Sequence, residues 1–491
     1  MVITRMTAIN IVNLSPKRLL TPPSKHLNVV WTSDTANATL REAVMNKFIY
    51  LLFFSVFFLD YFALKLDLID DKVALLPDIL SMVAVLVVAM LAVTGANAIV
   101  KKYVTLFFVF LAVIAMGIAI NGLSSGTLII GIRNYLKFLP FFLVPAVYAF
   151  SDKEISRQLK FILALVLIQG PLALFQKFVQ FGIRSSGDFI SGTLSSGGQI
   201  PILMGGVIAV LTAFYLRGSI KTYLYIFCLG IILIPVVLSE SKASIGYLPL
   251  AFFVPIYFNK RREKKSGNSF AVLAIFSLVA VLFVGVYDYF AQYGRESARG
   301  GLVQFFTSGT AETYLNRGAV SARRVTKTGY VDVILLPLTQ LSEEPMKLFF
   351  GLGIGSVSDS AIEGLKEGKD NYKKYDIAIG SSASLFLWEI GIFGLLIYLL
   401  FFYMILQDAK KLSGAQGLRG ILGLGWCGVV AIAGLALFFR TMFADGANAY
   451  AFWYFSGLIV ALSAGLGRER VVLNPRKGLA AKHRLARESA V

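Results

Sequence analysis

Long apolar runs recur along most of the chain, and this feature limits the possible folds more than any other. Each of these runs holds about 18 or more residues with few charges, which is long enough to cross a bilayer as a helix. Charged residues make up 15% of the chain, against about 25% in a typical soluble domain. The sequence therefore predicts an all-α, polytopic membrane helical bundle.

The run lengths predict about twelve transmembrane helices. They cover residues 45–64, 75–98, 103–120, 128–150, 159–181, 199–216, 222–239, 244–258, 270–290, 383–406, 420–440 and 448–466. One long polar segment separates the ninth helix from the tenth. We therefore expect a disordered cytoplasmic tail (1–43), helices one to nine (44–290), a long extracytoplasmic loop (291–382), helices ten to twelve (383–466) and a basic cytoplasmic tail (467–491).

Basic residues are distributed so that they orient the predicted bundle. Lys and Arg collect in alternate connectors, for example NKRREKK at 259–265, and in both tails. Because cytoplasmic loops are rich in Lys and Arg, we expect both termini in the cytoplasm and the long loop on the outer side. The same rule accounts for the formal net charge of +19, so that charge does not indicate a nucleic-acid partner.

Charges on the predicted outer side are few, and the long loop carries their strongest basic cluster. This cluster contains Arg317, Arg323, Arg324 and Lys327. Basic residues that orient a membrane protein gather on its cytoplasmic side, so a basic cluster on the outer side does not serve as a topology signal. Guanidinium groups bind phosphate in bidentate geometry. The cluster therefore predicts a pyrophosphate ligand at the membrane surface. Binding of acidic headgroups without chemistry is the alternative.

Three further basic residues lie in shorter outer connectors. Arg184 begins a Gly- and Ser-rich stretch whose backbone N–H groups suit an anion, although a simple flexible turn would have the same composition. Lys242 stands beside Glu240 in SESKAS, where the two could form a surface ion pair of little energetic value. Arg440 and Asp445 bracket the last outer turn in a similar way.

Several charged residues fall inside predicted transmembrane helices, where charges are costly and usually functional, and Arg133 and Glu389 are the two that we take as site candidates. Arg133 is near the outer end of the fourth helix, so it could reach the same surface as the loop arginines or snorkel to the interface. Glu389 lies about two turns into the tenth helix, and we expect it to face the bundle interior and pair with a basic group.

No motif in the chain indicates a metal or a cofactor, and we predict none. GLGIGS at 351–356 lacks the third glycine and the βαβ context of a dinucleotide loop. Cys228 and Cys427 lie within apolar runs, as small core residues do. The two histidines, His26 and His483, lie in the two tails, so no loop histidine is available as a catalytic base.

Taken in order, several stretches resemble the O-antigen ligase/O-antigen polymerase family. These are SGTLSSGGQIPILMGG after the fifth helix, SESKASIGYLPLAFF, the stretch from Arg323 to GLGIGS, and LFLWEIGIFGLL around Glu389. The resemblance implies a bacterial cytoplasmic (inner) membrane enzyme that moves glycans from an undecaprenyl-diphosphate carrier to an acceptor. Ligases of the family carry a His-Asn pair where this chain has Gly380 and Ser381, so the polymerase side of the family is favoured.

The sequence thus predicts a metal-independent membrane glycosyltransferase that polymerises undecaprenyl-diphosphate-linked repeat units into O-antigen, capsule or exopolysaccharide. The expected catalytic residues are Arg323, Arg324 and Glu389, and the expected substrate-binding residues are Arg184, Arg317, Lys242, Arg133 and Arg440. Candidates for activating the acceptor hydroxyl are Asp359, Glu363 and Asp376. The lipid bilayer, a chain-length regulator and a flippase are candidate partners. A ligase acting on a lipid or protein acceptor and a polysaccharide or lipid transporter stay open as alternatives.

Overall fold

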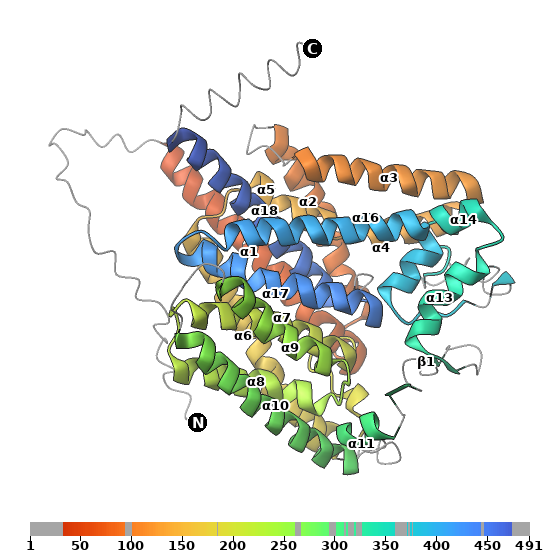
Figure 1. Ribbon diagram of the computed structural model, residues 1–491. Coiled ribbons are helices and arrows are strands. Elements are labelled where there is room, and N and C mark those ends of the chain that lie inside the picture. The colour runs from red at the N-terminus through yellow and green to blue at the C-terminus, as the bar shows by residue number, and fades with distance from the viewer. Residues whose placement is uncertain are drawn as a thin grey trace, which may run out of the picture.

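The computed structural model describes most of the chain between residues 33 and 473. The described residues are 33–93, 101–260, 267–293 and 301–473, without 184, 309–310, 313–318, 321–326, 359–370, 372–373, 376 and 443–445. Within them the fold is a bundle of helices (Figure 1). Two short strands, β1 (Ala319–Val320) and β2 (Lys327–Thr328), form an antiparallel pair.

Thirteen described helices form the bundle. They are α1 (Ser33–Asp60), α2 (Leu76–Val93), α3 (Lys101–Asn121), α4 (Ser125–Leu136), α5 (Leu139–Val147), α6 (Asp152–Phe175), α7 (Ile200–Leu216), α8 (Thr222–Leu238), α9 (Ser244–Lys260), α10 (Gly267–Tyr293), α16 (Ser382–Leu412), α17 (Gly417–Phe439) and α18 (Gly446–Leu473). Between α10 and α16 lie the shorter α11 (Leu302–Thr307), α13 (Tyr330–Gln340) and α14 (Pro345–Phe350). Single π-helical turns extend α1 (Tyr61–Lys65) and α6 (Gln176–Gln180).

Among the described residues, eight helices are long and apolar enough to cross a membrane. The bent pair α4 and α5, which meet at 42°, would make a ninth span, and Pro140 in the first turn of α5 cannot continue the hydrogen-bond ladder of α4. Each of the twelve predicted segments coincides with a helix or, for the fourth, with this pair. The chain is thus built as a multi-span membrane protein. Because α2, α8 and α9 are shorter, the count of twelve spans stays a prediction.

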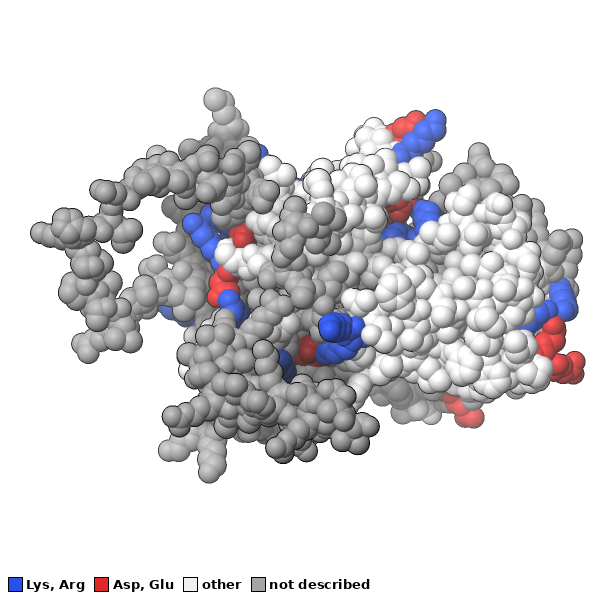
Figure 2. Space-filling view, turned by 90° about the horizontal axis from the view of Figure 1, so that it is seen from above, with Lys and Arg blue, Asp and Glu red and all other residues white. Residues whose placement is uncertain are grey.

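The burial of the apolar helices separates the centre of the bundle from its rim. In α7 and α17, 72% of the residues in an 18-residue apolar stretch are buried inside the protein, whereas in α10 and α3 the shares are 22% and 33%. Helices α7 and α17 therefore form the centre, and α10 and α3 present most of their apolar surface outward. In the space-filling view most of the described face is white, with Lys, Arg, Asp and Glu in small separate groups (Figure 2).

The short elements between α10 and α16 lie together at one end of the bundle, which we call the loop end (Figure 1). Part of this region has a small core of its own, formed by Leu341, Leu352, Val357, Tyr375, Ile377 and Trp388. Trp388 belongs to α16, so the loop segment is packed directly on a helix of the bundle. That the loop end faces the outer side of a membrane stays a prediction.

Candidate functional site

The connector between α6 and α7 folds back into the bundle at the loop end. The side-chain oxygen of Gln169, which lies within α6, accepts a hydrogen bond from Thr193 N (2.8 Å). Gln176 exchanges two hydrogen bonds with the backbone of Gly192, each 2.8 Å long. Gly192 has a φ of +59°, and a Cβ there would collide with the Gln169 amide. Irregular backbone beside an apolar helix needs such internal partners. The connector is packed back onto α6 by these contacts, and we call it the re-entrant segment.

Lys65, at the end of α1, reaches the same re-entrant segment. Its ammonium group donates hydrogen bonds to Ser191 Oγ and to Leu194 O (2.8 Å). Burial lowers the pKa of Lys65 to about 8. Sequence reasoning did not single out this residue, because it stands alone at the end of an apolar run beside acidic residues. The structure adds it to the basic groups at the loop end.

The turn between α8 and α9 is held by a buried ion pair. Glu240 Oε1 accepts a hydrogen bond from Lys177 Nζ at 3.0 Å, and their side chains are 3% and 0% exposed. Glu240 has a φ of +50°, and its carbonyl accepts from Tyr287 OH at 3.0 Å. The predicted surface pair of Glu240 with Lys242 is therefore wrong: Glu240 is engaged in the interior by a lysine that is 63 positions away in the sequence.

Lys242 lies beside an apolar pocket at the loop end. Its ammonium group is 5.0 Å from the centre of the Phe305 ring. Residues of helices α9, α11, α13 and α17 line the pocket, which is partly open. Its larger lining side chains are Lys242, Tyr247, Phe305, Phe306, Tyr330 and Phe439. The rings of Tyr330 and Phe439 are 5.6 Å apart. The pocket thus combines aromatic walls with one cationic group.

Arg440 directly follows Phe439, which lines the pocket, and it makes polar contacts beside the pocket. Its carbonyl accepts hydrogen bonds from Ser382 N (2.8 Å) and Ser382 Oγ (3.0 Å), which ties the end of α17 to the start of α16. Its guanidinium group packs on the re-entrant segment, since a Cβ on Gly198 would lie 2.5 Å from Arg440 Cζ. Arg440 also interacts electrostatically with the hydroxyl of Tyr247. Its predicted neighbour Asp445 lies outside the described residues.

Several buried polar atoms around Arg440 and the SESKAS turn have no hydrogen-bond partner within the described part of the chain. Four of them can donate: Ser241 Oγ, Ser244 Oγ, Tyr247 OH and Arg440 Nε. Two others, Gln199 Oε1 and Glu240 Oε2, can only accept. Buried polar groups in native proteins are nearly always hydrogen-bonded. This group of atoms is therefore suited to a polar ligand that both accepts and donates hydrogen bonds.

Arg133 and Glu389, the two candidate site residues within predicted transmembrane helices, do not line this pocket. Arg133 donates from Nε (2.8 Å) and Nη2 (2.6 Å) to the same carboxylate oxygen of Asp78, which joins α4 to α2. Its positive charge is therefore already paired. We expected Glu389 to face the interior with a basic partner. It is fully buried, and among the described residues backbone N–H groups and a serine hydroxyl donate to it.

The Glu389 side chain binds the two residues that directly follow the GLGIGS segment. Gly351, Gly353 and Gly355 all have positive φ angles, of +76°, +92° and +79°, which L-residues rarely adopt. Gly391 breaks α16 with a φ of +65°, and the carbonyls of Trp388 and Glu389 accept from Leu352 N (2.7 Å) and Gly353 N (3.0 Å). The glycines thus form a turn that is packed against α16. Sequence analysis excluded a dinucleotide loop here but did not foresee this structural role.

The remaining predicted site residues lie outside the described residues. They are Arg184, Arg317, Arg323, Arg324, Asp359, Glu363 and Asp376. Of the predicted residues that are described, Lys242 lines the loop-end pocket with Tyr247, and Arg440 interacts with Tyr247. Lys65 is an addition to these basic groups. No group of three or more His, Cys, Asp or Glu residues in the described ranges is arranged to hold a metal ion. Comparisons with protein-family models and with curated proteins find no match for this chain.

Proposed function

We propose that this chain is a membrane glycosyltransferase that polymerises undecaprenyl-diphosphate-linked oligosaccharide units. One observation carries the proposal: an aromatic, apolar pocket with Lys242 at its side adjoins a cluster of buried, unpartnered polar atoms around Arg440 and Tyr247. A polyprenyl-diphosphate glycan has the matching chemistry, because a hydrocarbon chain is joined through two phosphates to sugar hydroxyls. The pocket suits the first part, and the polar cluster suits the second.

In the proposed reaction Arg440 and Lys242 bind the donor diphosphate. The acceptor hydroxyl forms a new bond to the anomeric carbon of the donor glycan, and the bond from that carbon to the diphosphate breaks. The electron pair leaves on the diphosphate oxygen, where the two cations stabilise the developing charge. The hydroxyl proton passes to a base, for which Asp359, Glu363 and Asp376 are the proposed candidates. Arg184, Arg317, Arg323 and Arg324 are proposed to bind the same diphosphate.

Polymerisation is favoured over ligation by the start of α16. Where the ligases have a His-Asn pair, Ser381 Oγ accepts a hydrogen bond from Ser384 N at 3.1 Å and caps the helix. A serine engaged as a helix cap is a poor general base, because a hydroxyl is not basic at neutral pH. We also propose that the loop end faces the outside of a bacterial inner membrane and that both termini are cytoplasmic.

Deletion of the gene in its host separates polymerisation from the alternatives. A polymerase predicts loss of long glycan chains with single units still attached to their acceptor. A ligase or a transporter predicts loss of the single units as well. Gel analysis of surface glycan before and after complementation distinguishes these results.

Arg440→Lys then tests the proposed site in the complemented strain. Loss of one charge-assisted hydrogen bond costs about 1.5–3 kcal/mol, so long-chain product should fall roughly 10- to 150-fold at about 1.4 kcal/mol per decade. Arg419→Lys is the matched control, because Arg419 forms an ion pair with Asp152 far from the pocket. Normal chain length in Arg440→Lys, at a normal protein level in the membrane, would remove Arg440 from the site.

A further inference from the structure

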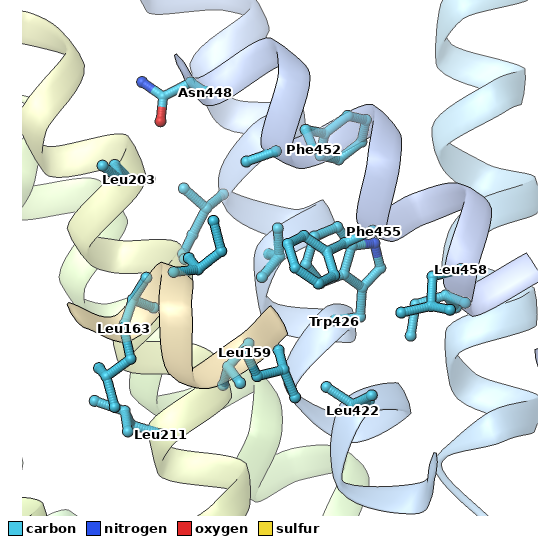
Figure 3. Close-up of a pocket in the computed structure, with 18 of the residues that line it drawn as sticks. Leu159, Leu163, Leu203, Leu211, Leu422, Trp426, Asn448, Phe452, Phe455 and Leu458 are labelled. Atoms are coloured by element: carbon cyan, nitrogen blue, oxygen red, sulfur yellow. The ribbon is translucent and has the colours of Figure 1, made fainter. Parts of the chain in front are cut away.

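A second apolar space lies between α6 and α7 on one side and α17 and α18 on the other. Its labelled side chains come from all four helices, and only Asn448, at one end, is a polar residue (Figure 3). Trp426 forms one wall and packs against Phe452 and Phe455 with ring centres 6.2 and 5.8 Å apart. This groove is distinct from the loop-end pocket and shares none of its lining residues.

The length of the groove suits one hydrocarbon chain. On α7 its lining runs from Ile202 to Phe214, which is about 18 Å at about 1.5 Å per residue. Half of the hydrocarbon core of a bilayer is about 15 Å thick. A groove of this length and apolar lining between membrane helices is suited to an acyl chain from one leaflet.

The two ends of the groove differ in charge. At the end away from the loop it is lined by Lys160, which is the last charged residue before the apolar part of α6. No described residue forms a hydrogen bond or an ion pair with Lys160. Arg217 and Lys221 flank the lining residues Phe214 and Ile220 at this end. At the other end Asn448 donates to Gln199 O (3.0 Å), and no cation lines the groove there.

We propose that this groove binds an anionic phospholipid, with one acyl chain between the two helix pairs and the phosphate group on Lys160. The charge at the mouth fixes the direction of the lipid, since its headgroup must lie at the basic end. The lipid site is independent of the proposed enzymatic activity.

Two substitutions address the acyl chain and the headgroup separately. Gly206→Leu places a side chain in the groove, since a Cβ on Gly206 meets only the Val429 side chain, at 3.8 Å or more. Gly230→Leu on α8 is its control, because Gly230 is exposed and a Cβ there meets nothing within 4 Å. Lys160→Gln removes the cation from the mouth. Lys153→Gln is its control, on the same helix and exposed but outside the groove.

The test is native mass spectrometry of the full chain, purified in detergent and titrated with phosphatidylglycerol or phosphatidylcholine. We expect one phosphatidylglycerol to stay bound to the wild type and to both controls, Gly206→Leu to lose it, and Lys160→Gln to bind it about fivefold more weakly. Equal retention of the two lipids would overturn the proposal. Unchanged phosphatidylglycerol binding in Gly206→Leu or Lys160→Gln would also overturn it. So would a polyprenyl diphosphate retained in place of the phospholipid, or a wild-type dimer that Gly206→Leu alone dissociates, since the groove would then be an interface between two copies of the chain.

Discussion

Replacing Glu389 tests whether this side chain fastens the GLGIGS turn to α16. Its Oε1 atom accepts hydrogen bonds from Val357 N (3.0 Å), Ser358 N (2.7 Å) and Ser358 Oγ (2.8 Å). In Glu389→Ala two backbone N–H groups lose their acceptor, at about 1–3 kcal/mol each when buried. Opening of the turn should then become easier by about 4 kcal/mol, which is roughly a thousandfold.

The substitution Glu389→Gln separates the anchoring role from the catalytic role that the sequence predicts. Glutamine keeps one carbonyl oxygen as an acceptor and loses only the charge, which contributes about 1 kcal/mol to such a hydrogen bond. The turn should therefore open only about fivefold more readily than in the wild type. If Glu389 acts in catalysis as well, Glu389→Gln should abolish long-chain product while leaving the turn almost intact.

Hydrogen–deuterium exchange of the detergent-purified chain measures the opening directly in peptides that cover 351–358. Glu343→Ala is the control, since Glu343 is an exposed acid of the same region. We expect fast exchange in Glu389→Ala, intermediate exchange in Glu389→Gln and unchanged exchange in the control. Exchange in Glu389→Ala that matches the wild type would refute the anchoring role, because the two amides would then not depend on the carboxylate.

Three further predictions address topology, acid stability and the buried ion pair. Reporter fusions at Lys264 and Lys366 should lie on opposite sides of the membrane, and the same side for both would mean an error in the helix count. Hydrogen bonds, first of all from Lys347, hold the pKa of Glu344 at about 2 against an ordinary value of 4.5. The stability that ionised Glu344 contributes is complete above pH 4.5 and is lost as the pH falls toward 2. Proteolysis near α14 should therefore rise only between pH 4.5 and pH 2. Lys177→Met leaves a buried carboxylate unpaired and should lower the free energy of unfolding by about 3–5 kcal/mol in denaturant titrations, whereas an unchanged midpoint would contradict the buried pair.

The helices could be located from the sequence because the length of an apolar run is a local property. All twelve predicted segments contain helix, and even the segment with Pro77 and Asp78 does, since α2 begins one residue before the proline. The first turn of a helix tolerates proline because its N–H groups have no partner within the helix. Asp78 is then accounted for by Arg133, a partner 55 positions away that run lengths do not reveal.

Whether a polar connector lies on the surface or packs into the bundle could not be predicted from the length of apolar runs. Composition alone does not distinguish a Gly- and Ser-rich surface turn from the re-entrant segment between α6 and α7, because the difference lies in its contacts with Gln169 and Gln176. Those glutamines stand in an apolar run and could have been noted as polar residues in need of internal partners. The loop-end site depends on such long-range contacts, so only its basic residues were recognisable in advance.

Glu240 connects the buried ion pair to the proposed donor site. A non-glycine residue with a φ of +50° costs on the order of 1–3 kcal/mol, and it persists where its surroundings fix it. Here Lys177 holds the carboxylate, Tyr287 holds the carbonyl, and the backbone of Gly187 packs so closely that a Cβ there would lie 2.5 Å from Ser239 O. These contacts set the direction of the chain just before Lys242. The contacts of the strained residue therefore fix the backbone two residues before Lys242, which lines the pocket.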